Sequence, residues 1–182
     1  MRAIFLIFFI SIYSFAITLP TKVYTTIASV NGDSVTLSEP LPYKGMSALV
    51  VRNKSNLDYA LVFIKSVGGN SAVVIDKDPV GGKNLAKLNP IVNIGDRVIG
   101  GFNYDKVLVI APKEQYNQIV SQLGAKVIDS DIYYAYRASG GNSGYRDFAK
   151  KSGIGLVIVS NGNNIEIIDA ISEKTILKES LK

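Results

Sequence analysis

The side chains that could carry out chemistry in this sequence are carboxylates, lysines, tyrosines and serines. Its 182 residues include no His and no Cys, which removes the Ser-His-Asp triad, the Cys-His dyad, the thiolate zinc site and the imidazole proton shuttle. The nearest approach to an acid/base pair is Asp129 with Asp131, followed later by Asp147. Nothing in the pattern places these carboxylates in a catalytic pocket. The sequence therefore predicts a protein that is not an enzyme.

Two further patterns point only weakly to ligands. Asp76 and Asp78 have the spacing of a calcium loop, but no further acidic residues follow and the Gly of such a loop is missing. The Gly-rich segment 139–144 precedes a predicted helix, as in phosphate sites, yet it lacks the Lys-Ser/Thr of a P-loop. Solvated turn carboxylates and a simple helix connection are the favoured interpretations. We predict neither a metal nor a cofactor.

Tyr133, Tyr134 and Tyr136 form an aromatic cluster. Such a cluster can be a contact surface for a protein partner, because Tyr offers a large area at low entropic cost. Packing of two of the three into the core is an equal alternative. If one contacts a partner, we expect Tyr133 or Tyr134 to be exposed. The 20 basic residues exceed the 15 acidic ones but are scattered, with Lys150-Lys151 the only adjacent pair, so no nucleic-acid partner is expected.

Residues 1–16 have the pattern of a signal peptide. They begin with Met1-Arg2, include 13 hydrophobic residues and end in the small-x-small spacing of Ser14-Phe15-Ala16. The run is shorter than the roughly 20 apolar residues of a membrane-spanning helix. We therefore expect cleavage after Ala16 and a mature chain that is exported to the periplasm or cell surface, with no stable membrane span. An uncleaved anchor is the alternative.

The first half of the remaining chain, residues 17–104, is dominated by a period of two. Gly, Asn and Pro turns, such as Asn31-Gly32, separate short runs rich in β-branched residues. The predicted strands are 22–30, 34–37, 47–52, 59–67, 72–76 and 97–100, with residues 77–94 as a long connection. Short strands joined in this way predict a small antiparallel β-barrel.

The second half, residues 105–182, alternates strands with helices. The predicted strands are 106–110, 127–128, 156–159, 165–168 and 175–178. One helix starts at Pro112 and stops at Gly124, a second is capped by Ser130 and runs to about residue 137, and a third spans 145–152 before Gly153.

In the second helix, Ile132, Ala135 and Tyr136 share the face predicted to pack. This order predicts a small α/β sandwich with its helices on one side of the sheet. The fold class is thus α+β, with a β-barrel domain over residues 17–104 and an α/β domain over residues 105–182.

The order of these segments resembles the N-terminal domain family of the plasminogen-binding protein PgbA. The resemblance rests on TTIASVNGDS at 25–34, GMSALVV at 45–51, IGDRV at 94–98, VLVIAP at 107–112 and GIGLVI at 153–158. It covers essentially the whole chain after the signal peptide. The second half is also similar to small α/β domains of envelope assembly proteins such as TolB and the flagellar protein FlgT, a likeness that concerns fold alone.

The resemblance implies a non-catalytic bacterial envelope or surface protein that captures plasminogen. Capture of this kind uses a lysine, whose ammonium pairs with acidic residues and whose stem lies on aromatic rings. Lys182 at the end of the sequence and Lys178 nearby would supply it, with Tyr133 and Tyr134 as further contacts. The alternative is a periplasmic structural or assembly module, resembling envelope and flagellar accessory proteins, whose partners are envelope proteins.

Overall fold

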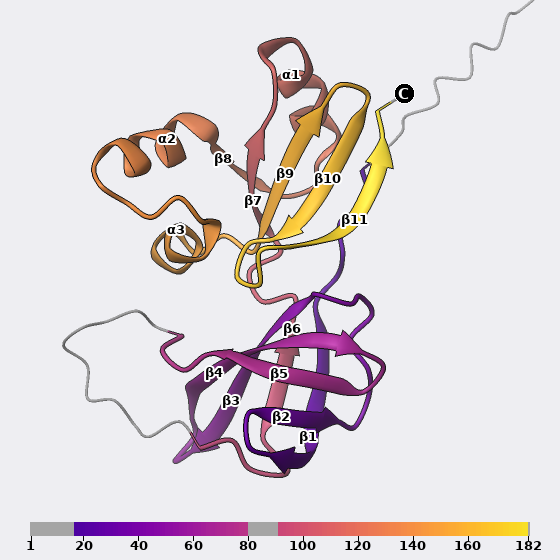
Figure 1. Cartoon of the computed structure of the whole chain (residues 1–182), viewed down its shortest axis with the longest axis vertical. Coiled ribbons are helices and arrows are strands. Elements are labelled where there is room, and N and C mark those ends of the chain that lie inside the picture. The colour runs from indigo at the N-terminus through magenta and orange to yellow at the C-terminus, as the bar shows by residue number, and fades with distance from the viewer. Residues whose placement is uncertain (1–16, 80–90, 182) are drawn as a thin grey trace, which may run out of the picture.

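A barrel of six strands forms the lower part of the molecule in Figure 1. The computed structural model describes residues 17–79 and 91–181, so the predicted signal peptide, most of the 77–94 connection and Lys182 lie outside the described residues. The strands are β1 (Val23–Asn31), β2 (Ser34–Leu37), β3 (Ser47–Lys54), β4 (Leu57–Gly68), β5 (Ser71–Asp76) and β6 (Arg97–Gly100). They close in the order β1-β2-β5-β4-β3-β6, all antiparallel. The predicted antiparallel barrel is confirmed.

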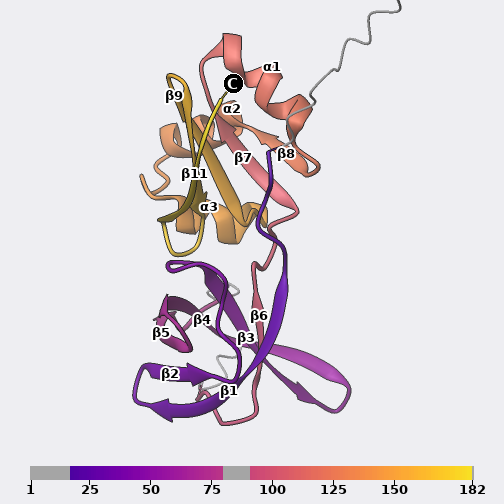
Figure 2. The same ribbon diagram turned by 90° about the vertical axis from the view of Figure 1, so that its right-hand side faces the viewer.

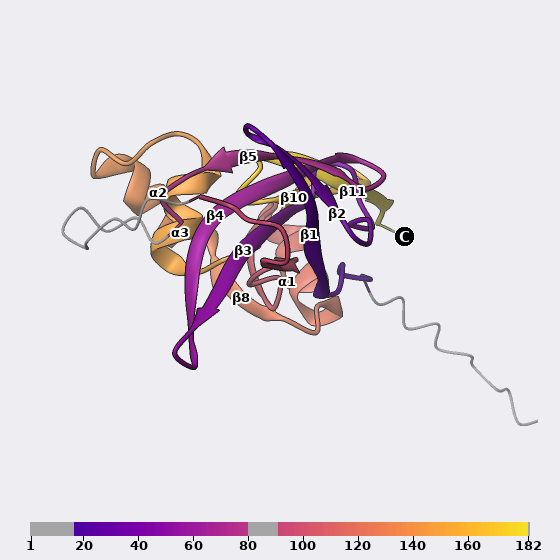
Figure 3. The same ribbon diagram turned by 90° about the horizontal axis from the view of Figure 1, so that it is seen from below.

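The barrel closes where β6 pairs with both β1 and β3. Gly100 makes this closure possible, because a Cβ there would lie 2.6 Å from the Val23 side chain and 2.7 Å from that of Leu41. Every second residue of the strands points inward, so that Val50 and Ile64 are fully buried. Figure 3 shows the barrel from its far end, where the β3–β4 hairpin extends beyond the wall.

The second sheet has five strands in the order β11-β10-β9-β7-β8. They are β7 (Lys106–Ile110), β8 (Lys126–Asp129), β9 (Leu156–Asn161), β10 (Asn164–Asp169) and β11 (Lys174–Ser180). β7 is parallel to both β8 and β9, whereas β10 and β11 are antiparallel hairpin strands. Parallel neighbours need crossover connections, and helices α1 (Lys113–Gln122), α2 (Ser130–Ala138) and α3 (Tyr145–Ser152) lie within them. We call this part of the chain the α/β unit.

The three helices cover both faces of this sheet, so the prediction of helices on one side was wrong. Ile119 of α1 belongs to the same packed cluster as Val107 and Val109, while α2 and α3 pack with Leu108 from the opposite face. Figure 2 shows α1 on one side of β7 and the other two helices on the other. The cause is the central position of β7: a strand buried on both faces is apolar throughout and does not indicate which side a helix covers.

The helix ends differ in detail from the prediction. Asp129, not Ser130, caps α2, because its carboxylate accepts a hydrogen bond from the Asp131 N–H at 2.9 Å. Helix α1 ends through an extended Leu123, so Gly124 does not stop the helix as a left-handed cap. Gly153 does end α3 in the predicted way, with φ of +69°.

The barrel and the α/β unit pack against each other through a continuous apolar seam. Leu49 and Phe63 on the outer surface of the barrel share one cluster with Phe148 of α3 and Ile171 after β10. The rings of Phe63 and Phe102 lie 6.3 Å apart across the connection. The division of the chain into domains at residues 104 and 105 stays a prediction.

A buried carboxylate, Asp169, ties the two parts together. Its side chain has no exposed surface, and one oxygen accepts hydrogen bonds from the backbone N–H and the hydroxyl of Ser47, each at 2.7 Å, and from the Tyr104 hydroxyl at 2.5 Å. The other oxygen accepts from the backbone N–H groups of Ile171 and Ser172. Burial, reinforced by the charge of Asp169, raises the pKa of Tyr104, so its phenol stays a donor.

Two further polar contacts cross the same seam. Lys150 of α3 forms an ion pair with Asp76 of β5 at 2.8 Å, and both side chains are largely buried. The Ser172 hydroxyl donates to the Gly45 carbonyl at 2.5 Å. Together with Asp169, these contacts fix the orientation of the barrel relative to the α/β unit.

Replacing Asp169 with Asn tests the seam. Asn keeps the shape of the side chain but removes its negative charge, and its amide N–H groups would face other hydrogen-bond donors. We therefore expect the free energy of unfolding to fall by about 3 kcal/mol. Urea denaturation measures this change. Asp105→Asn is the matched control, because Asp105 is exposed in a turn and its replacement should stay within about 0.5 kcal/mol of wild type. Equal stability of the two variants would contradict the role of Asp169.

Candidate functional site

Tyr133 is a core residue of the α/β unit. Only 3% of its surface is exposed, its hydroxyl donates to the Ser143 carbonyl at 2.7 Å, and its ring centroid lies 5.2 Å from that of Phe148 and 5.4 Å from that of Tyr145. Burial raises the pKa of Tyr133. The expectation that Tyr133 is an exposed contact residue was therefore wrong, because this position of α2 faces the sheet.

The remaining tyrosines divide between packing and exposure. Tyr136 is half-buried against Phe148, with the Lys151 ammonium 4.9 Å from its ring centroid. Tyr134 is 49% exposed and stays available to a partner. The packed face of α2 thus consists of Tyr133 and Tyr136, whereas Ile132 and Ala135, which the sequence placed on that face, are exposed.

Lys178 lies in the edge strand β11 with 69% of its side chain exposed. Its ammonium contacts the carboxylate of Glu166, its cross-strand partner on β10, at 2.7 Å. Hydrogen bonds from Lys178 and from Thr175 lower the pKa of Glu166. Lys182 lies outside the described residues.

The predicted contact residues do not form one surface. Tyr134 is on α2, which packs beside β7 and β8, whereas Lys178 is on β11 at the opposite edge of the sheet. Figure 1 shows the two elements on opposite sides of the α/β unit. A partner that contacts Lys178 therefore approaches the hairpin edge of the sheet and not the aromatic cluster.

The acidic residues considered for chemistry have structural partners instead. Asp129 caps α2, Asp147 accepts a hydrogen bond from the Asn142 amide, and Asp76 pairs with Lys150. Across residues 17–79 and 91–181, no three carboxylates come together as a metal site. The interpretation of Asp76 as a solvated turn carboxylate was wrong, because Asp76 ends strand β5 and is largely buried in its ion pair with Lys150.

The N-terminus of α3, considered as a phosphate site, is covered by a carboxylate of the protein itself. Glu173 accepts a hydrogen bond from the Arg146 N–H at 3.2 Å. The same carboxylate lies so close to Gly144 that a Cβ there would be 2.3 Å from its oxygen. Because Glu173 occupies the place where an anion would meet the helix dipole, this loop is not a phosphate site in the observed conformation.

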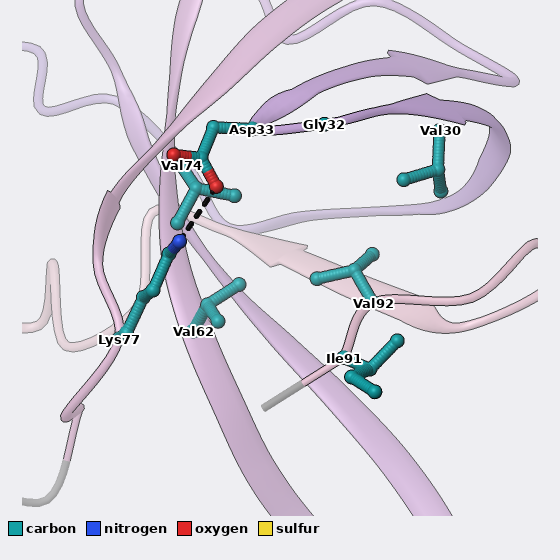
Figure 4. A pocket seen from close by; sticks show the side chains of 8 residues that line it. All are labelled: Val30, Gly32, Asp33, Val62, Val74, Lys77, Ile91 and Val92. Atoms are coloured by element: carbon teal, nitrogen blue, oxygen red, sulfur yellow. Dashed lines mark ion pairs between the residues drawn. The ribbon is translucent and has the colours of Figure 1, made fainter. Parts of the chain in front are cut away.

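A shallow apolar hollow of about 300 Å³ opens in the barrel (Figure 4). Its apolar walls are Val30, Val62, Val74, Ile91 and Val92. An ion pair between Asp33 and Lys77, with 2.7 Å between its charged atoms, crosses the rim. Among the described residues that line the hollow, the charged groups are this ion pair alone, and its two charges neutralise each other.

A second hollow, of about 400 Å³, lies at the seam, and we call it the lysine groove. It is lined by Lys44, Gly45, Lys65, Ser66, Val67, Lys174 and Thr175. The first five belong to the barrel side of the seam and the last two to β11. Sequence reasoning missed this groove and the Asp169 network, because their members are far apart in the chain and each lysine taken alone resembles a solvated surface residue.

A comparison with known protein families finds a match over nearly all of the described residues. Residues 22–182 match the family described as plasminogen-binding protein pgbA N-terminal. The chain belongs to this family. The match spans the barrel, the seam and the α/β unit, and it confirms the resemblance found in the sequence. No curated protein and no solved structure matches the chain.

The description of the family names a plasminogen-binding protein. Among the residues that the structure describes, none of the helices is both long and apolar enough to cross a membrane. The exposed candidates for contact in this family member are Lys178 and Tyr134, on opposite edges of the second sheet.

Replacing Tyr133 or its neighbour Tyr134 with Ala should lower the stability of the protein by very different amounts. Tyr133→Ala removes a buried ring and its hydrogen bond, so we expect a loss of about 3 to 5 kcal/mol in the free energy of unfolding. Tyr134→Ala is the matched control and should cost about 1 kcal/mol or less, because the ring is half exposed. Denaturant unfolding followed by circular dichroism measures both. Similar losses in the two variants would contradict the burial of Tyr133.

Proposed function

We propose that this member of the plasminogen-binding family is an exported, non-catalytic protein of the cell envelope or surface that captures plasminogen through a lysine side chain. The single observation that carries the proposal is the position of Lys178, exposed on the free edge of a rigidly anchored sheet. Family membership supports the choice of partner. Lys182 is the second proposed lysine, and Tyr134 is a separate contact on α2.

The surroundings of Lys178 suit capture by a site that binds lysine. In such a site an ammonium pairs with carboxylates and its aliphatic stem packs on aromatic rings. The Lys178 ammonium already has one carboxylate partner, Glu166, and that pair is exposed. Exposed ion pairs contribute little to stability, so Lys178 can exchange Glu166 for the carboxylates of a partner without disturbing the strand.

We expect Lys178→Ala to weaken binding of an isolated plasminogen kringle at least about tenfold, since it removes the ammonium that the partner ligates. Glu166→Gln should strengthen binding about threefold, because it removes the competing carboxylate. Surface plasmon resonance measures both. The matched control is Lys113→Ala, which removes another exposed lysine from the start of α1 and should leave binding unchanged.

Lys182 is tested separately by deleting it alone and together with Lys178→Ala. We expect each change to weaken kringle binding and the combination to abolish it. Free lysine should compete with the wild-type chain in the same assay. Unchanged binding in the combined variant would overturn capture through these two lysines.

The alternative function, a periplasmic structural or assembly module, predicts a different location. Treatment of intact cells with protease should remove a surface protein and spare a periplasmic one. We expect loss of the full-length band from intact cells, detected with an antibody against the α/β unit, while a known periplasmic protein survives. Protection of the chain from protease until the outer membrane is permeabilised would favour the assembly module, whose partners are envelope proteins.

A further inference from the structure

We propose that the lysine groove binds a multiply charged oxyanion of the phosphate class. This inference goes beyond plasminogen capture, because it uses different lysines and a different ligand. Lys44 and Lys65 come from the barrel, and Lys174 comes from the first position of β11. A ligand in the groove would therefore touch both parts of the molecule at once.

The positive charge of the groove is not balanced by the described part of the chain. Lys44, Lys65 and Lys174 form no ion pair with any carboxylate in residues 17–79 and 91–181. Two acidic residues close to Lys174 in the chain have other partners: Glu173 bonds to the start of α3, and Asp169 accepts five hydrogen bonds at the seam. Three like charges lining one hollow repel one another, and a bound anion relieves that repulsion.

The seam holds the walls of the groove in place. Gly45 has φ of +91°, and a Cβ there would lie 2.9 Å from the Cβ of Lys174, so only glycine allows this approach. The Gly45 carbonyl accepts a hydrogen bond from Ser172, and Ser47 donates to Asp169. Since the barrel wall and β11 are fixed before any ligand arrives, little ordering is needed when the ligand binds.

The type of cation favours phosphate over a single carboxylate. Lysine ammoniums are compact point charges that can surround a tetrahedral anion from several sides, whereas planar carboxylates are best matched by the fork of arginine. Among the described residues, the groove is lined by three lysines and no arginine. A phosphate monoester or diphosphate, free or as the headgroup of a lipid, has the matching charge and shape.

The test uses the full chain with inorganic pyrophosphate at constant ionic strength. We expect pyrophosphate to raise the melting temperature above that in chloride, because a ligand that binds only the folded state stabilises it. Calorimetric titration should show one site, with affinity falling about tenfold in Lys65→Gln and in Lys174→Gln and vanishing in the double variant. The matched controls, Lys113→Gln and Lys178→Gln, should bind pyrophosphate like the wild type.

Two further arms identify the source of the phosphate. Vesicles containing phosphatidic acid, a phosphate monoester, that retain the wild-type chain but not the double variant would indicate a lipid headgroup, whereas binding of pyrophosphate alone indicates a soluble ligand. A tetraglutamate peptide that binds more tightly than pyrophosphate would overturn the phosphate class. Identical pyrophosphate binding by the double variant, or no stabilisation beyond chloride, would overturn the site. Kringle binding in the same variants reports independently on plasminogen capture.

Discussion

The structure depends on one buried carboxylate that accepts five hydrogen bonds and forms no ion pair within the described part of the chain. The Asp169 carboxylate accepts from both the barrel, through Ser47, and the linking residue Tyr104, while its other oxygen accepts from Ile171 and Ser172. Taking a carboxylate out of water is costly unless its oxygens are satisfied. If the barrel moved away from the α/β unit, Asp169 would lose both hydrogen bonds from Ser47. The two parts are therefore joined by a polar requirement as well as by apolar packing.

This constraint also determines where the exposed lysines lie. Asp169 ends β10, and the turn that follows holds Ser172 against Gly45 before β11 begins at Lys174. The start of β11 is thus anchored to the barrel, while its far end, with Lys178, extends along the free edge of the sheet. One end of the strand contributes to a preorganised groove, and the other offers a side chain to solvent. Rigid elements that carry accessible side chains are the usual basis of specific binding.

Local patterns predicted most of the strands and the helices, because alternation and turn residues are short-range signals. They failed where burial is decided by distant contacts. The apolar run at β7 could not show that helices cover both its faces, and the spacing of α2 could not show that Tyr133 is buried while Ile132 is exposed. Ser47 and Asp169 are 122 residues apart, and no local pattern connects a serine and an aspartate at that separation.

The net charge of the chain illustrates the same limit for function. An excess of 20 basic over 15 acidic residues, spread singly along the sequence, suggests no particular partner. In the folded protein, some of these lysines pair with carboxylates and others do not pair with any described carboxylate. Lys178 is matched by Glu166 across the strand, and Lys150 by Asp76 across the seam, whereas the lysines of the groove meet at the junction without a carboxylate in the described residues. A weak average charge thus becomes a local positive field, and such a field selects ligands by their charge and shape.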